Sequence, residues 1–233
     1  MPFNFVKGYA IHFDYGSKPP LDVYLLNSKK ESVTLYPKSG ETGAIAYVLD
    51  KGPWFISGRW FNPSEVVTGN LGAHVFYDNI ILTSGITNLE MSEVAAKNTV
   101  SITPKAKDGS TFNYHSGVFQ IVHKASGSGS AMIEFPANAS TLSIKINNIS
   151  NSRSVQFNIQ SKKNNELYFS NWQFLEGINS NLILSNSVND LIALDVLANQ
   201  HRKTSIGADL IPNFCFNYTT GTYVFGRVCG AAT

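Results

Sequence analysis

Apolar and polar side chains alternate along much of the chain with a period of two residues. In LSIKINNISNSRSVQFNIQ, residues 142–160, Leu142 and Ile144 are apolar and have polar neighbours, and the alternation resumes at Val155 and Phe157 after a polar break. Because successive side chains of a strand point to opposite faces, the stretch predicts two strands with one buried face each. We expect them to form a hairpin whose Asn and Ser side chains face outward.

The same period predicts strands through most of the chain, separated by turn signals rich in Gly, Pro, Asn and Asp. The segments with this pattern are 21–25, 33–35, 43–63, 73–85, 116–122, 167–175 and 213–228. Segment 43–63 reads as two strands joined by an Asp-Lys-Gly-Pro turn, and segment 73–85 as a strand pair or one bulged strand broken at Asp78-Asn79. Segment 213–228 reads as a hairpin.

Two segments carry a helical signal. Residues 87–97 place Thr87 three residues before Glu90, ahead of an Ala-rich stretch, which indicates a helix of about two turns. Residues 188–200 fit a helix and a strand about equally well, and the strand-rich surroundings favour a strand.

Short strands with frequent turns and no βαβ rhythm predict an all-β fold, an antiparallel sandwich or jelly roll with at most one or two short helices. Composition changes near residue 97, from Pro, Gly and charged residues to Asn and Ser. We expect a smaller N-terminal β unit at 1–97 and a C-terminal sandwich at 98–233. The Gly/Ser run at 124–132 is interpreted as a hairpin loop within the sandwich.

Charge is sparse. Charged residues make up 15% of the chain and the formal net charge is +2, while roughly one residue in ten is Asn. Nucleic-acid binding needs a concentrated basic stripe, which this chain lacks, so we expect no nucleic-acid partner. No apolar stretch is long enough to span a bilayer as a helix, and the first residues are a poor match to a secretory signal. We therefore expect a virion or an extracellular surface as the location, and a membrane partner is disfavoured.

The two cysteines are Cys215 and Cys229. A hairpin turn centred on Thr220-Gly221 would place Cys215 opposite Gly226, so the cysteines would not face each other across the strands. A disulfide requires Cα atoms within about 7 Å, which favours two free thiols.

No pattern of catalytic or metal-binding residues is recognisable. The five histidines stand at no metal-ligand spacing, and nucleophile-elbow, phosphate-loop and dinucleotide motifs are absent. A glycosidase would need two converging carboxylates. The acids that could supply such a pair are Glu134, Glu166, Glu176, Asp190 and Asp195, and nothing local selects two of them. We expect no catalytic residues, no metal, no cofactor and no enzyme activity.

Two aromatic clusters are the candidate binding residues. WFISGRWFNP contains Trp54, Arg59, Trp60 and Phe61, and YFSNWQF contains Tyr168, Asn171, Trp172 and Gln173. Exposed rings can stack on sugars or pack against a partner, and amides can pair with hydroxyl groups. The competing interpretation is that Phe55, Trp60 and Trp172 fill the core.

These observations favour a non-enzymatic assembly or adhesion module, such as a capsid, tail or fibre component of a virus or phage particle. Its expected partners are copies of itself or other structural proteins, with affinity supplied by interface area. The alternative is a carbohydrate-binding, lectin-like module. A membrane-active β protein and a jelly-roll glycosidase are less favoured. The inference rests on composition and pattern, because no motif assigns a partner.

Overall fold

The structure is a computed structural model of the 233-residue chain. It describes residues 8–83, 85–123, 129–150, 153–163, 166–186, 214–217 and 222–225. The chain divides into two compact units, Met1–Leu191 and Ile192–Thr233. In the second unit the described residues form one antiparallel hairpin, β15 (Phe214–Asn217) and β16 (Thr222–Phe225).

The first unit is built on a seven-stranded sheet with the order β14-β8-β11-β6-β5-β2-β3. Its strands are β2 (Asp22–Asn27), β3 (Ser32–Leu35), β5 (Trp54–Trp60), β6 (Asn70–Ile80), β8 (Asn98–Ile102), β11 (Leu142–Ile146) and β14 (Leu182–Leu184). Two helical segments, α1 (Pro63–Val66) and the 3-10 turn η1 (Glu93–Ala95), are short, as expected.

Two smaller sheets complete the first unit. The three-stranded sheet has the order β4-β1-β7, from β1 (Tyr9–Asp14), β4 (Gly43–Val48) and β7 (Ile86–Glu90). The four-stranded sheet has the order β10-β9-β12-β13, from β9 (His115–His123), β10 (Gly129–Ala137), β12 (Arg153–Lys163) and β13 (Glu166–Phe174). The all-β prediction is confirmed, although β1-β7, β6-β11 and β8-β14 pair in parallel.

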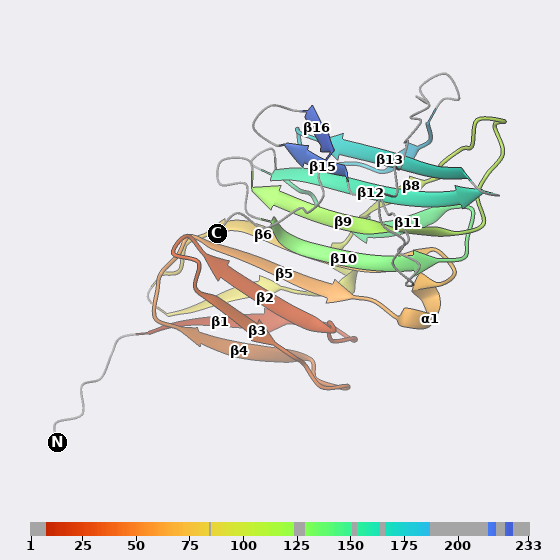
Figure 1. The fold of residues 1–233 in the computed structure, drawn as a ribbon. Coiled ribbons are helices and arrows are strands. Elements are labelled where there is room, and N and C mark those ends of the chain that lie inside the picture. The colour runs from red at the N-terminus through yellow and green to blue at the C-terminus, as the bar shows by residue number, and fades with distance from the viewer. Residues whose placement is uncertain are drawn as a thin grey trace, which may run out of the picture. The chain divides into compact units, whose positions relative to one another are not determined.

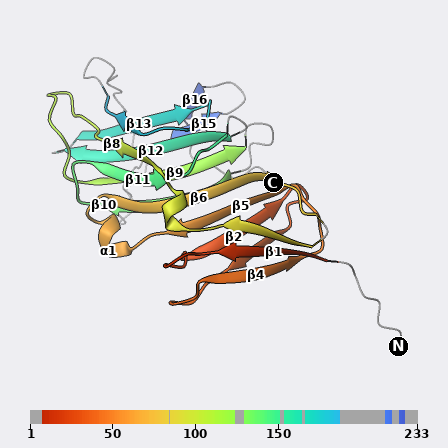
Figure 2. The same ribbon diagram turned by 180° about the vertical axis from the view of Figure 1, so that it is seen from behind.

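The seven-stranded sheet lies between the two smaller sheets (Figures 1 and 2) and has a hydrophobic cluster on each side. The β1 core, against the three-stranded sheet, includes Ile11, Phe13 and Trp60. The β12 core, against the four-stranded sheet, includes Phe119 and Phe157. Apolar residues of β5 and β6 contribute to both cores, so these two strands are covered on both faces.

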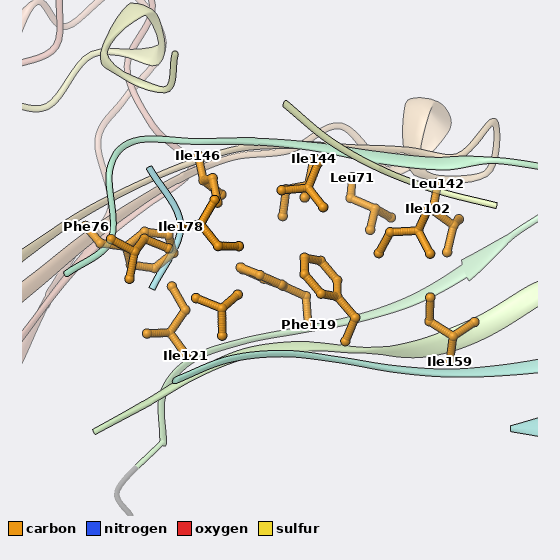
Figure 3. Packing of buried hydrophobic residues seen from close by; sticks show 14 of the residues in the cluster. Leu71, Phe76, Ile102, Phe119, Ile121, Leu142, Ile144, Ile146, Ile159 and Ile178 are labelled. Atoms are coloured by element: carbon orange, nitrogen blue, oxygen red, sulfur yellow. The ribbon is translucent and has the colours of Figure 1, made fainter. Parts of the chain in front are cut away.

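Figure 3 shows how the β12 core fills the space between two sheets. Side chains of β11, including Ile144 and Ile146, point from the seven-stranded sheet toward Phe119 and Ile121 of β9. Phe119 and Phe157 lie with ring centroids 4.9 Å apart. The alternating apolar positions of 142–160 are therefore buried, as the sequence predicts.

The strands at 142–146 and 153–163 do not pair with each other, so the expected hairpin is wrong. β11 pairs with β6 and β8, and β12 pairs with β9 and β13. The chain crosses from one sheet to the facing one between them. Alternation specifies which side chains are buried, and a strand in either of two facing sheets meets that requirement equally well.

Two irregularities in β6 change which of its side chains face which core. Between Asn70 and Ala73 two residues of β6 oppose one residue of β11, and Gly72 has a φ of 81°. A second bulge lies at Asn79, φ 56°, where the sequence predicts a break. A bulge inserts one unpaired residue and reverses the facing of the residues beyond it. Within segment 73–85, residues 73–80 therefore belong to one bulged strand, not to a strand pair.

The helix expected at 87–97 is largely replaced by a strand. β7 runs in parallel beside β1, Leu89 packs against the β1 core, and the Met91 N–H donates to the Asp14 carbonyl at 2.7 Å. Only η1 is helical in this segment. Pairing with β1 therefore outweighs a local capping pattern whose effect is about 1 kcal/mol.

The expected division at residue 97 stays a prediction, and the β12 core takes residues from both sides of it, including Phe55 and Phe76 before it and Phe119 after it. The β1 core lies within residues 9–96, whereas the seven-stranded sheet takes strands from both sides of residue 97. β9 and β10 are antiparallel neighbours, and residues 124–128 of the Gly/Ser run between them lie outside the described residues. Residues 188–200 and Cys229 lie outside the described residues, and Cys215 pairs in register with Val224 rather than with Gly226.

No helix in the described part of the chain combines the length and apolar character needed to cross a membrane.

Candidate binding surfaces

The tryptophans of the first aromatic cluster are buried in the β1 core. Trp54 and Trp60 are each 2% exposed, and each indole N–H donates to a backbone carbonyl, of Asp50 at 3.0 Å and of Lys18 at 2.9 Å. A ring that stacks on a sugar or a partner must present a face to solvent. These two rings therefore have a structural role, which is the competing interpretation at Trp60.

Arg59 lies on the opposite face of β5 from the tryptophans. Its Nε donates to Asp22 Oδ1 at 2.8 Å and its terminal nitrogen contacts Asp22 Oδ2, a bidentate pair across β2 and β5. Hydrogen bonding to Asp22 raises the pKa of Arg59 above its usual value, against the effect of burial. Phe61 is partly buried against the β12 core. The first cluster is thus divided between two faces of the sheet.

The second aromatic cluster is also divided by the strand period. Trp172 packs against the β12 core, and Tyr168 lies against Phe112 with ring centroids 4.8 Å apart. Asn171 and Gln173 point to the other face of β13. The sequence brings these four residues together, but β13 presents the rings and the amides to different surroundings.

Asn171 and Gln173 belong to a polar network across the outer face of the four-stranded sheet, which we call the amide ladder. It consists of Gln120, Ser154, Gln156, Asn158, Asn171 and Gln173, from β9, β12 and β13. The Gln120 amide donates to Gln156 at 2.8 Å, Gln173 donates to the Ser154 hydroxyl at 3.2 Å, and Asn171 donates to Asn158. Gln156 is 1% exposed. These amides bond to one another, and Gln156 is not available to solvent.

The buried histidines sit in structural positions. His74 is fully buried between Phe76 and Phe119, and burial, followed by the charge of Arg59, lowers its pKa to about 3. His115 shares a 2.7 Å hydrogen bond with Ser161, and burial lowers its pKa. Both rings are held in the neutral form near pH 7.

Of the acids considered for a carboxylate pair, Glu166 is engaged with a cation of the same chain. Glu166 contacts Lys107 and accepts from the Tyr168 hydroxyl at 2.7 Å, and the bond to Lys107 lowers its pKa. Asp190 and Asp195 lie outside the described residues. Among the described residues no group of three or more His, Cys, Asp or Glu is placed to hold a metal ion.

A shallow cleft lies beside α1, lined in part by Lys18, Trp60, Phe61, Glu65 and Glu93. Lys18 and Glu93 form an ion pair at 3.2 Å, Glu65 accepts from an Asn side chain at 2.8 Å, and Lys145 completes a lining of two basic and two acidic side chains. The cleft therefore presents compensated charges.

The outer face of the three-stranded sheet is an exposed apolar surface that the sequence reasoning missed. We call it the β4 face and define it by Ile45, Tyr47, Leu49 and Ile86, which are 45%, 78%, 72% and 59% exposed. Tyr47 and Ile86 lie on either side of Ala10 in one row across the sheet. Ile45 lies in the next row, beside His12, whose Nδ1 is 3.1 Å from the side-chain oxygen of an Asn on β7.

The signal for this surface is present in the segment GAIAYVL, residues 43–49. Every position in it is apolar, so the pattern predicts a strand without showing which face is exposed. The structure decides this, because Ala46 and Val48 pack into the β1 core and leave Ile45, Tyr47 and Leu49 outside. Small residues on the buried face and large ones outside reverse the usual arrangement.

Comparisons with known proteins give weak similarity. No family model matches the chain, and no curated protein sequence matches it. Among solved structures, a proposed cell adhesion protein from Bacteroides ovatus has a TM-score of 0.28 at 10% identity, covering 78% of this chain and 93% of that one. A proposed adhesin from the same organism has a TM-score of 0.27 at 12% identity, with 84% and 94% covered.

The Bacillus anthracis TIE protein has a TM-score of 0.24 at 8% identity, and the match covers 76% of this chain and 33% of that protein. This chain therefore matches about a third of the length of the Bacillus protein. Similarity at TM-scores below 0.3 assigns neither a family nor a function to this chain.

Proposed function

We propose that this chain is a non-enzymatic adhesion or assembly module that works by surface contact, and that the β4 face is its contact surface. The supporting observation is the exposure of four large apolar side chains on one face of a sheet whose other face packs into a core. A contiguous exposed apolar surface on a folded domain often marks an interaction site.

The scaffold beneath the β4 face suits this role. Ala46 and Val48 of the same strand are buried in the β1 core with Phe13 and Trp60, so the outward side chains are mounted on a packed sheet. Rigid apolar anchors lose little conformational entropy on binding, which favours contact through them.

The finer form of the proposal is a structural or host-recognition component of a virus or phage particle, with other copies or structural proteins as partners. Carbohydrate binding is the alternative, and its ring platform would need two or three exposed aromatic side chains in a row. Trp54 and Trp60 are buried, which leaves Tyr47 as the exposed aromatic side chain of the β4 face.

Bead binding tests the proposal. Beads coated with the full chain are mixed with like-coated beads, and the labelled chain is applied to a glycan array. We expect the wild type to bind at least one probe and the double variant Tyr47→Ser, Leu49→Ser to lose that binding. The matched control is Ile183→Ser, because Ile183 on β14 is 90% exposed and lies in a different sheet.

Binding that survives in the double variant, or that is lost equally in the Ile183 control, would overturn the assignment of the β4 face. A wild-type chain that binds neither probe would count against the contact function itself.

A further inference from the structure

Strand β4 has an open edge whose backbone groups are ordered for pairing. It stands at the end of the order β4-β1-β7, so in the part of the chain that the structure describes its outer edge pairs with no strand. The Thr42 carbonyl accepts from the Tyr15 N–H at 2.8 Å, on the β1 side. Because the direction of backbone groups alternates along a strand, those of Gly43, Ile45 and Tyr47 point away from β1.

This edge lacks the features that usually prevent edge-to-edge pairing. Natural edge strands are short, or carry charges, Pro residues or bulges. In the same unit β3 has four residues, β14 has three, and β10 contains Pro136 and a register shift. In contrast β4 has six residues without a charge, a proline or a register shift.

We propose that β4 pairs antiparallel with β4 of a second copy, about a two-fold axis through Ala46. This inference rests on the proposed function and names a second copy as the partner of β4, the strand that carries Ile45 and Tyr47 of the β4 face. The register places Ile45 opposite Tyr47 of the second copy and Gly43 opposite Leu49, and in every such pair both residues direct their backbone groups to the shared edge. The two sheets then form one six-stranded sheet with a continuous apolar face.

Charge complementarity supports this register. Glu41 and Lys51 lie in the segments that flank β4, each five residues from Ala46, so the dyad brings Glu41 of one copy near Lys51 of the other. The dyad repeats the pair, so two opposite-charge pairs flank the apolar rows. A register centred on Ile45 or Tyr47 would instead place Glu41 opposite Leu49 or Pro53. Opposite charges directly across a strand pair are favourable, and a two-fold interface must be complementary to itself.

The oligomeric state is the first measurement. Size-exclusion chromatography with light scattering should give twice the 25.5 kDa mass of one chain for the wild type and for Ile183→Ser. The variant Ile45→Lys, Tyr47→Lys should give one chain mass, because it places lysines opposite lysines across the pair. Its circular dichroism spectrum should remain that of the wild type, since both side chains are on the exposed face.

A cysteine pair tests the register. Under mild oxidation Ala46→Cys should form a disulfide-linked dimer, because directly opposed, non-hydrogen-bonded positions have Cα atoms about 4.5 Å apart. Ala44→Cys, two residues away on the same face, should not link to itself. Peptide mass spectrometry separates this bond from any bond made by Cys215 or Cys229.

A charge exchange gives an independent readout. Glu41→Lys and Lys51→Glu should each weaken the dimer about tenfold, since each reversal creates two like-charge pairs. The double exchange should restore the wild-type dissociation constant. Failure of the double exchange to restore it, or linkage of Ala44→Cys instead of Ala46→Cys, would overturn the register.

The outcomes separate this inference from the proposed function. A monomeric wild type whose glycan binding depends on Tyr47 and Leu49 would overturn the self-pairing and leave the contact function in place. A dimer linked through Ala46 whose beads neither cluster nor bind glycans would support the self-pairing and overturn the adhesive role.

Discussion

The two outer sheets of the first unit place different side chains on the faces that point away from their cores. On the four-stranded sheet the outward positions include Gln, Asn and Ser side chains that bond across three strands, beside Phe169, which is 41% exposed. On the three-stranded sheet they include Ile45, Tyr47 and Ile86, which are exposed. Both sheets obey the same alternation, so period two alone does not specify what the second face is for.

The polar face stabilises the folded chain itself, whereas the apolar face can stabilise a complex with another surface. Each amide of the ladder has bonding partners in neighbouring strands, so its free energy contribution is realised within one chain. The apolar side chains of the β4 face remain hydrated in the isolated chain and contribute when another surface covers them. We therefore expect substitutions in the amide ladder to change stability and substitutions on the β4 face to change association.

The largest expected effect comes from a substitution in the bulge at which the facing of the β6 side chains reverses. At Gly72 a Cβ would lie 1.9 Å from the Trp60 carbonyl oxygen, at a φ of 81°. Gly72→Ala should therefore lower the free energy of unfolding by about 4 kcal/mol or more. The measurement is urea unfolding followed by circular dichroism.

Gly40→Ala is the matched control, because Gly40 has a φ of 87° and nothing within 4 Å of a Cβ. It should cost about 1–2 kcal/mol, the conformational part alone. Equal losses in the two variants would mean that the close approach at Trp60 does not constrain β6.

The positions of the strands are more predictable from the sequence than the strands with which they pair. Hydrophobic periodicity located β11, β12 and β13 correctly, because one buried face leaves a pattern in the sequence. It could not show that β11 and β12 lie in facing sheets, since either arrangement buries Ile144 and Phe157. At Thr87–Glu90 a capping pattern was outweighed by pairing with β1, a contact about 75 residues away in the chain.

The candidate site was less predictable for a related reason. Trp54 and Trp60 share a facing with Ile56, so strand parity could have placed both in the core with it. Tyr47 carries no such signal, because its neighbours on both faces are apolar and only the packing of Ala46 decides which side is buried. An all-apolar strand predicts burial on both faces, and its exposed face becomes visible only in three dimensions.

An intermediate effect concerns His74, on the four-stranded side of β6. Burial, followed by the charge of Arg59, lowers its pKa from 6.5 to about 3. The unfolded chain therefore binds more protons between these values, and stability falls as the pH drops from about 6.5 toward 3. By pH 4 the loss should be about 3 kcal/mol. His74→Leu should remove this part of the pH dependence in urea unfolding at pH 7 and pH 4.

Phe76→Leu is the control for His74, because it alters the stacked neighbour without removing a titratable group. It should lower stability at both pH values and keep the pH dependence. An unchanged pH dependence in His74→Leu would show that another group is responsible for acid sensitivity on this side of the molecule.

The smallest expected effects come from two substitutions, one on the outer face of each outer sheet. Gln156→Met keeps the side-chain volume but removes the acceptor of the 2.8 Å bond from Gln120, and should cost about 1–2 kcal/mol. Tyr47→Ser, at a position 78% exposed, should change the unfolding free energy of the single chain by less than about 0.5 kcal/mol.

These unfolding experiments in urea must be run at high dilution, because association would stabilise the wild type by mass action. At higher concentration the order should reverse, with Tyr47→Ser losing the concentration-dependent part of the stability and Gln156→Met retaining it. A wild-type midpoint independent of concentration would contradict this reversal, and the apolar side chains of the β4 face would then have no role in association between copies.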